Sequence, residues 1–179
     1  MALTRLGLNQ SVNLASNVTG TLPTANGGTG ATSFAPGKVL QFVNQEEQAS
    51  FVTNSSSAVD SGLNVSITPT ATNSKILLHV NCTVRTAGNT YCMFKIYRQI
   101  NGGGYSELDQ LEGGWHYYIN ETISDSYVGR KVDTTHNTTN QIDYKIYCNV
   151  QGGGGNMTIN PDTTNALGNF SAMEIGAWF

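Results

Sequence analysis

The stretch KILLHVNCTVR, residues 75–85, decides the fold. Apolar side chains occupy every second position, at Ile76, Leu78, Val80, Cys82 and Val84. The alternate positions from His79 to Arg85 are polar. Successive side chains of a β-strand point to opposite faces of a sheet, so this alternation predicts a strand with one buried face.

The same period of two continues on both sides of this stretch. It predicts strands at residues 38–43, 49–53, 63–68, 91–100, 105–108, 127–132, 141–150 and 157–159, and a last strand whose buried face is Met173, Ile175, Ala177 and Phe179. Turn residues separate these segments, and residues 101–104 predict a hairpin tip. Residues 109–125 are less regular, whereas residues 133–140 and 152–156 predict exposed polar loops. The pattern predicts an all-β, antiparallel β-sandwich that is jelly-roll-like in topology.

Composition narrows the functional class. Only 12% of the residues are charged, against roughly 25% in an average domain. The net charge is −3 and no basic run is present, so neither a nucleic-acid partner nor membrane insertion is predicted. The opening residues MALTRLGLNQ do not read as a secretory signal.

The chain divides into two parts. Residues 1–36 carry a single charge, Arg5, and a single aromatic side chain, Phe34. Such a segment cannot bury enough apolar surface to offset its ordering entropy. It must stay disordered, wind with copies of itself or lie on another protein, so we predict an extended N-terminal arm followed by a β-sandwich domain at residues 37–179.

The arm contains TGTLPTANGGTGATS, residues 19–33, which resembles the "GTLP-x-A-NGGTG" segment of bacteriophage tail-fibre and virion-fibre proteins. The body resembles small fibre-tip domains of that family at PGKVLQFV (36–43), SGLNVSITP (61–69), SKILLHV (74–80) and SAMEIGAWF (171–179). The resemblance implies a structural virion protein on a tail fibre or on the capsid surface, assembled in the host cytoplasm and released by lysis. The alternative within this class is a capsid decoration or head-fibre protein with no receptor role.

The resemblance also implies a homotrimer that joins other virion proteins through residues 1–36. The arm residues expected at these contacts are Leu22, Pro23, Asn26, Gly27, Gly28 and Gly30. Trp178 and Phe179 at the other end of the sequence suggest a covered edge at a subunit contact. The competing interpretation is an ordinary last strand with Phe179 in the core.

No catalytic or metal-binding set stands out. The three cysteines, Cys82, Cys92 and Cys148, are widely spaced on apolar strand faces, which predicts buried small side chains and not a disulfide framework or a zinc site. The three histidines do not have metal-ligand spacing. No cofactor and no enzyme activity are predicted. The alternative is a polysaccharide-degrading enzyme that uses two of Glu107, Asp109 and Glu112.

One aromatic cluster predicts a binding surface. GGWHYYIN, residues 113–120, places Trp115, His116, Tyr117 and Tyr118 in succession within a polar stretch. Flat rings with polar tips bind sugar faces, and Asp109 and Glu112 could accept hydrogen bonds from hydroxyl groups. We predict a contact with a host-surface glycan here. The alternative, which alternation favours, is a further strand with Trp115 and Tyr117 in the core and Tyr118 at a subunit seam.

Overall fold

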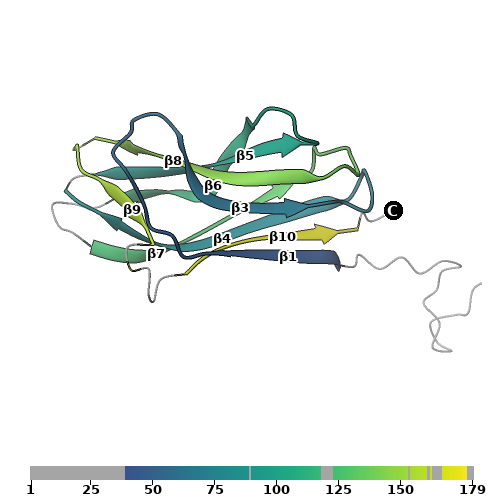
Figure 1. Ribbon diagram of the computed structural model, residues 1–179, viewed down its shortest axis with the longest axis horizontal. Coiled ribbons are helices and arrows are strands. Elements are labelled where there is room, and N and C mark those ends of the chain that lie inside the picture. Colours follow the sequence, from purple (N-terminus) through teal and green to yellow (C-terminus); the bar gives the residue numbers. More distant parts are fainter. Residues whose placement is uncertain are drawn as a thin grey trace, which may run out of the picture. The chain divides into compact units, whose positions relative to one another are not determined.

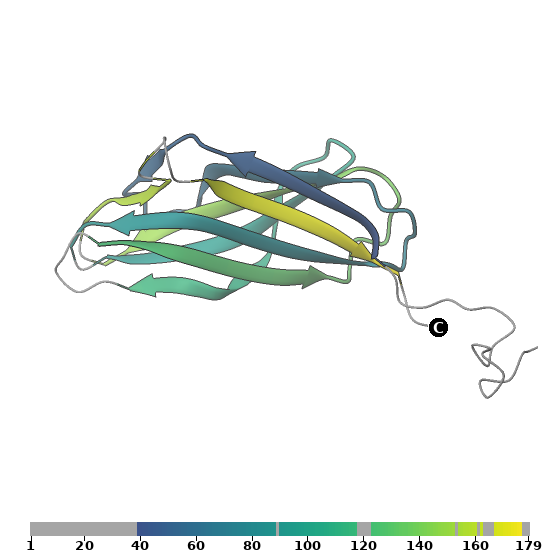
Figure 2. The ribbon, with the colours of Figure 1, turned by 90° about the horizontal axis from the view of Figure 1, so that it is seen from below.

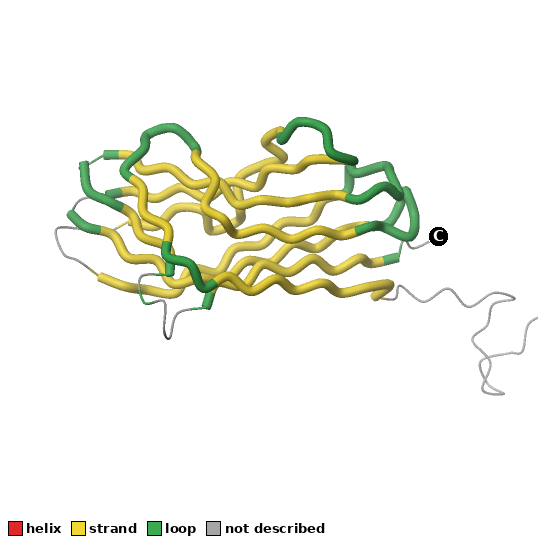
Figure 3. Tube along the Cα trace, viewed as in Figure 1, coloured by secondary structure: helices red, strands yellow, loops and turns green. Residues whose placement is uncertain are grey.

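The computed structural model describes residues 39–88, 90–117, 123–152, 154–160, 162 and 167–176, with side chains omitted at 110–117 and 123. The predicted arm at residues 1–36 therefore lies outside the described residues, as do Tyr118, Trp178 and Phe179. The described residues form strands and connecting loops and contain no helix (Figure 3). Accordingly, no described helix has the length and apolar character needed to cross a membrane.

Ten strands follow one another along the described chain. They are β1 (Val39–Glu47), β2 (Phe51–Thr53), β3 (Val59–Ile67), β4 (Lys75–Thr86), β5 (Tyr91–Ile100), β6 (Ser106–Tyr117), β7 (Ile123–Asp133), β8 (Ile142–Gln151), β9 (Met157–Ile159) and β10 (Gly168–Ile175). All their pairings are antiparallel.

The strands form the two layers visible in Figure 1. One layer has the order β1-β10-β4-β7 and the other has the order β6-β5-β8-β3. The chain crosses between the layers at most of its connections, so strands adjacent in a sheet are mostly distant in sequence. This arrangement of two interleaved four-stranded sheets is a jelly roll, which confirms the predicted fold class. The short strands β2 and β9 pair with each other, and β9 also pairs with β4.

The core lies between the two layers. On β4, the five apolar side chains of the deciding stretch are all at most 1% exposed. The predicted inner faces of three other strands are buried as well: Leu63, Val65 and Ile67 on β3; Cys92, Phe94 and Ile96 on β5; Ile142, Tyr144, Ile146, Cys148 and Val150 on β8. Across the layers, the rings of Phe94 and Tyr127 stack with centroids 4.1 Å apart. The alternation in the sequence thus identified most of the core.

The prediction of an irregular region at residues 109–125 is wrong for the described residues 109–117 and 123–125. The strand predicted at 105–108 continues as β6 to Tyr117, and β7 begins at Ile123. A large bulge hides this strand in the sequence, because residues 111–114 of β6 stand opposite Phe94 of β5 alone. Extra residues of this kind break the period of two on which the prediction relied.

The predicted inner face of the last strand is also wrong. Phe170, Ala172 and Glu174 face the core, whereas Met173 and Ile175 are half-buried on the outer side. Glu174 is 0% exposed. The hydrophobic pattern assigned this position to the outer face because glutamate is charged. Its carboxylate is satisfied by donors: Ser74 Oγ at 2.7 Å, Gln41 Nε2 at 2.6 Å and the Thr70 backbone N–H at 2.8 Å. Ala177 and Phe179, predicted on the same face, lie outside the described residues.

Candidate functional site

The aromatic stretch is part of a strand as far as the structure describes it. Gly113–Tyr117 belongs to β6, and Trp115 and His116 stand in register with Met93 and Cys92 of β5. The strand interpretation is therefore confirmed for the backbone of these residues. The side chains of Trp115, His116 and Tyr117 and all of Tyr118 lie outside the described residues, so their role in binding stays a prediction.

The β6 bulge changes the partner of this strand. Before and after the bulge β6 pairs with β5, whereas within it Glu112 stands in register with Arg130 of β7. The bulge therefore connects the two sheets at the edge where β6 and β7 meet. Bulges are frequent next to binding sites because they redirect side chains. Two of the predicted ligand-binding positions, Asp109 and Glu112, lie at this edge.

A surface hollow lies beside the bulge. Its volume is about 270 Å³, and its lining consists of Leu108, Asp109, Lys131, Val132, Asp133, Thr134 and Thr135. The Lys131 ammonium forms an ion pair with the Asp109 carboxylate, and both residues belong to this lining. A second hollow of about 290 Å³ shares Lys131 and Val132 and continues onto β4 at Leu77. We call the first of these the β6–β7 hollow.

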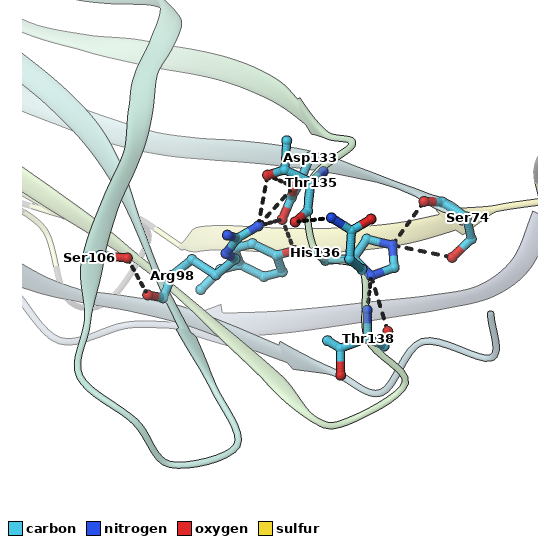
Figure 4. A network of polar contacts seen from close by, with 9 residues as sticks. Ser74, Arg98, Ser106, Asp133, Thr135, His136 and Thr138 are labelled. Atoms are coloured by element: carbon cyan, nitrogen blue, oxygen red, sulfur yellow. Dashed lines mark hydrogen bonds and ion pairs between the residues drawn. The ribbon is translucent and has the colours of Figure 1, made fainter. Parts of the chain in front are cut away.

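Asp133 forms the buried end of this hollow. Its side chain is 0% exposed, and Arg98 Nη1 from the opposite layer donates to both carboxylate oxygens at 3.0 and 2.8 Å. The Tyr144 hydroxyl donates at 2.7 Å and the Thr135 backbone N–H at 2.8 Å. Burial alone would raise the pKa of Asp133, but the hydrogen bonds from Tyr144, Thr135 and Arg98 outweigh it and lower this pKa. Figure 4 shows Arg98 reaching Asp133 from β5.

The loop after Asp133 is not simply an exposed polar loop, as the sequence predicted. His136 within it is 3% exposed. Its Nε2 lies 2.8 Å from the carbonyl oxygen of Ser74, and its Nδ1 lies 3.1 Å from the carbonyl oxygen of Thr138 (Figure 4). The hydroxyl of Ser74 in turn donates to Glu174. His136 thus ties the loop to the start of β4, which fixes the rim of the hollow.

The described groups offer little for covalent chemistry. Glu107 and Asp109, two of the three carboxylates considered for sugar hydrolysis, each form an ion pair, with Lys95 at 2.9 Å and with Lys131. All three cysteines are free and buried, and burial raises the pKa of the Cys82 and Cys92 thiols to about 12. No cluster of three metal-ligating side chains occurs within the described part of the chain. Charged groups and threonine hydroxyls at the hollow instead suit the binding of a hydroxyl-rich ligand.

Sequence reasoning found Asp109 but missed most of this site. Lys131, Thr134 and Thr135 belong to stretches that were interpreted as a strand and a polar loop. The signal that could have marked the site was Asp133, an acid directly after the apolar Val132. The arm residues from Leu22 to Gly30, like Trp178 and Phe179, lie outside the described residues, so their predicted contacts are untested.

Comparison with known proteins gave matches only among solved structures. No protein-family model and no curated protein sequence matches the chain. A structure of the infectious bursal disease virus Gx strain matches with 11% identity and a TM-score of 0.41, over 88% of this chain and 42% of that one. The VP2 subviral particle of this virus matches with 10% identity and a TM-score of 0.43, over 76% and 40%. Its T=1 particle matches with 10% identity and a TM-score of 0.44, over 83% and 44%. The chain spans less than half of each of these proteins.

Proposed function

We propose that this chain is a fibre-type structural protein of a bacteriophage virion. Its arm at residues 1–36 attaches it to the particle, and its jelly-roll domain is presented outward as a homotrimeric head. The observation that carries this proposal is the order of two features: TGTLPTANGGTGATS ends at Ser33, and the first strand of the head begins at Val39. A segment with few large apolar side chains, followed in the sequence by a β-domain, is expected of a subunit that attaches at one end and makes contacts at the other.

The head is proposed to bind a host-surface glycan along the β6–β7 edge. The hollow supports this role because Asp109, Lys131, Thr134 and Thr135 supply hydrogen-bonding groups around a partly apolar floor. The predicted aromatic contacts from Trp115 to Tyr118 follow on the same strand and the connection after it. Weak binding at each head would be multiplied by the several copies that a particle carries. The mechanism is reversible binding, without turnover of the ligand.

Labelling of intact phage particles tests the virion role. Antibodies against the purified chain are expected to decorate the tail fibres in electron micrographs. Labelling of the capsid instead would favour the decoration role, and particles without label would overturn the proposal. Release of reducing sugar from host capsule by the purified protein would show that the function is enzymatic degradation of the ligand and not reversible binding.

Binding of purified full-length protein to host cells tests the glycan site. Asp109→Ala is expected to weaken cell binding at least about tenfold, which corresponds to loss of one or two hydrogen bonds. Asp60→Ala is the matched control, because Asp60 forms a comparable exposed ion pair with Lys145 on another edge. Equal binding by both variants would exclude the β6–β7 hollow. Trp115→Ala separates the two interpretations of the aromatic stretch: an unfolded variant supports a core role, and a folded variant that does not bind supports contact.

A further inference from the structure

We propose that copies of this chain meet through the outer face of the sheet β1-β10-β4-β7. This inference deepens the fibre proposal, on which it rests for the number of copies, by naming the surface of contact. The face carries a band of apolar side chains, which we call the apolar strip: Val39, Phe42, Leu77, Val132, Met173 and Ile175. Figure 2 shows this sheet, with β10 in yellow between β1 and β4.

Strand register brings the strip together from four separate parts of the chain. Phe42 stands opposite Met173, Met173 opposite Leu77, and Leu77 opposite Val132. One row further along, Val39 stands opposite Ile175. Phe42 is 57% exposed, Val39 56% and Val132 43%. A row of apolar side chains that crosses a whole sheet on its solvent side is typical of a surface that binds another protein.

The border of the strip is polar. The next row across the sheet reads Asn44, Ser171, His79 and Arg130 in register. An apolar centre beside a row of amide, hydroxyl and cationic groups has the composition of a protein–protein interface, with its fully buried core and its polar rim.

The strip has complementary features at its two edges, which points to a second copy as the occupant. At one edge, Phe42 projects from β1 with more than half of its surface exposed. At the other edge lies the hollow of about 290 Å³ between Leu77, Arg130, Lys131 and Val132. A projecting ring and a hollow on opposite edges of one face allow the ring of each copy to enter the hollow of the next. Contacts of this head-to-tail kind close into rings when the rotation between copies allows it.

The course of the chain supports the same occupant. The arm enters the head at Val39, and β10 ends at Ile175 beside it, so both ends of the described domain lie at the strip. Copies that meet through their strips would bring their Val39 residues, where the described domain begins, close together. Winding with the arms of neighbouring copies is one way in which a segment with one charge and one aromatic side chain becomes ordered.

The test is the mass of full-length protein by light scattering at micromolar concentration. The wild type is expected at three times the mass of one chain. Phe42→Lys places an ammonium group in a hollow lined by Arg130 and Lys131, so like charges meet in every contact, and it should raise the dissociation constant at least about 100-fold. Because Phe42 is mostly exposed within one copy, the variant should keep the circular dichroism of a folded β-protein. Val52→Lys is the matched control, since Val52 is 55% exposed on β2, outside the strip, and the change should leave the mass unaltered.

A double variant tests the pairing of ring and hollow directly. Phe42→Lys combined with Val132→Glu places opposite charges at each contact, so it should assemble more strongly than Phe42→Lys alone. A monomeric wild type, a Phe42→Lys variant that stays assembled, or a double variant no stronger than Phe42→Lys alone would overturn the inference. Failure here is distinguishable from failure of the proposed function, because particle labelling reports the virion role whatever the solution mass.

Discussion

Asp133→Asn removes one negative charge from the most completely enclosed ion pair among the described residues. The asparagine has nearly the same volume, so the change leaves no cavity. The Arg98 guanidinium, whose side chain is only 18% exposed, loses its partner, and the Tyr144 hydroxyl loses a charged acceptor. The two strands that carry these groups belong to the layer opposite β7. The variant therefore weakens a connection between the layers as well as a local contact.

The loss in free energy of unfolding can be estimated from the burial of this ion pair. Removing one partner of a buried ion pair costs about 3–5 kcal/mol, because the remaining charge is left without compensation. Asparagine keeps an amide oxygen that can accept from Tyr144 or Thr135, so we expect the lower end, about 3 kcal/mol. A typical domain has a free energy of unfolding of about 5–15 kcal/mol, so the loss is a large fraction of the total.

Urea denaturation at one fixed protein concentration measures this loss. The midpoint should fall with little change in the slope, since the surface exposed on unfolding is the same. Glu107→Gln is the control: its ion pair with Lys95 is exposed, and it should cost less than about 1 kcal/mol. A change at Asp133 no larger than that of the control would refute the idea that burial makes this pair strong.

The pH dependence provides a second check on the same residue. The pKa of Asp133 is lower in the folded protein than its usual value of 3.8, so the unfolded chain takes up the proton more readily. The stabilisation by the carboxylate is thus fully present above pH 3.8 and is lost as the pH falls through the folded-state pKa. The difference in free energy of unfolding between wild type and Asp133→Asn should accordingly become smaller as the pH falls below 3.8. A constant difference down to the lowest pH at which the wild type stays folded would contradict this reasoning.

Three further predictions concern the core and a tight turn. Glu174→Gln should lower the free energy of unfolding in urea by about 1–3 kcal/mol at pH 7. Hydrogen bonds outweigh burial and lower the pKa of Glu174 from 4.5, so this loss should become smaller below pH 4.5. An unchanged urea midpoint at pH 7 would contradict this prediction. Gly155→Ala should lower the thermal midpoint strongly, since its Cβ would lie 1.6 Å from the Ala87 carbonyl oxygen, whereas Gly104→Ala, with open space, should be nearly neutral; equal shifts would refute the steric argument. The three buried cysteine thiols should resist a disulfide reagent at pH 8 until urea is added, and rapid labelling of the folded protein would show that they are accessible.

The sequence was sufficient to predict the fold class because most strands have one apolar face. On β4 the alternation of side chains matches the observed burial residue by residue, and on β5 and β8 it identifies the inner face, although Met93 and Asn149 on the other face are buried as well. The jelly-roll order follows from pairings between distant strands, and no local pattern encodes these pairings directly. The sequence therefore predicted most of the strands and their inner faces, with β6 and β10 as the exceptions, and the number and spacing of the strands indicated the jelly-roll-like topology.

The candidate site was less predictable because its residues lie where the period of two fails. The bulge at residues 111–114 interrupts the alternation of side chains along β6, so the aromatic stretch could be interpreted as a loop. Asp133 looked like the first residue of a polar loop, yet its partners Arg98 and Tyr144 come from the opposite layer. A network between layers depends on how the sheets pack, and short-range sequence patterns do not report it.

The error on β10 has a different cause. This strand carries apolar residues on both faces, Phe170 and Ala172 inside and Met173 and Ile175 outside, and the carboxylate of Glu174 faces inward. Either face of such a strand fits the period of two, and the sequence pattern assigned the core to the face that is the outer one in a single copy of the chain. In an assembly that meets through the apolar strip, Met173 and Ile175 would be buried as the sequence predicted, against other copies of this sheet. The same mass measurement on Phe42→Lys that tests the strip therefore decides whether the outer apolar face of β10 forms an interface between copies of the chain.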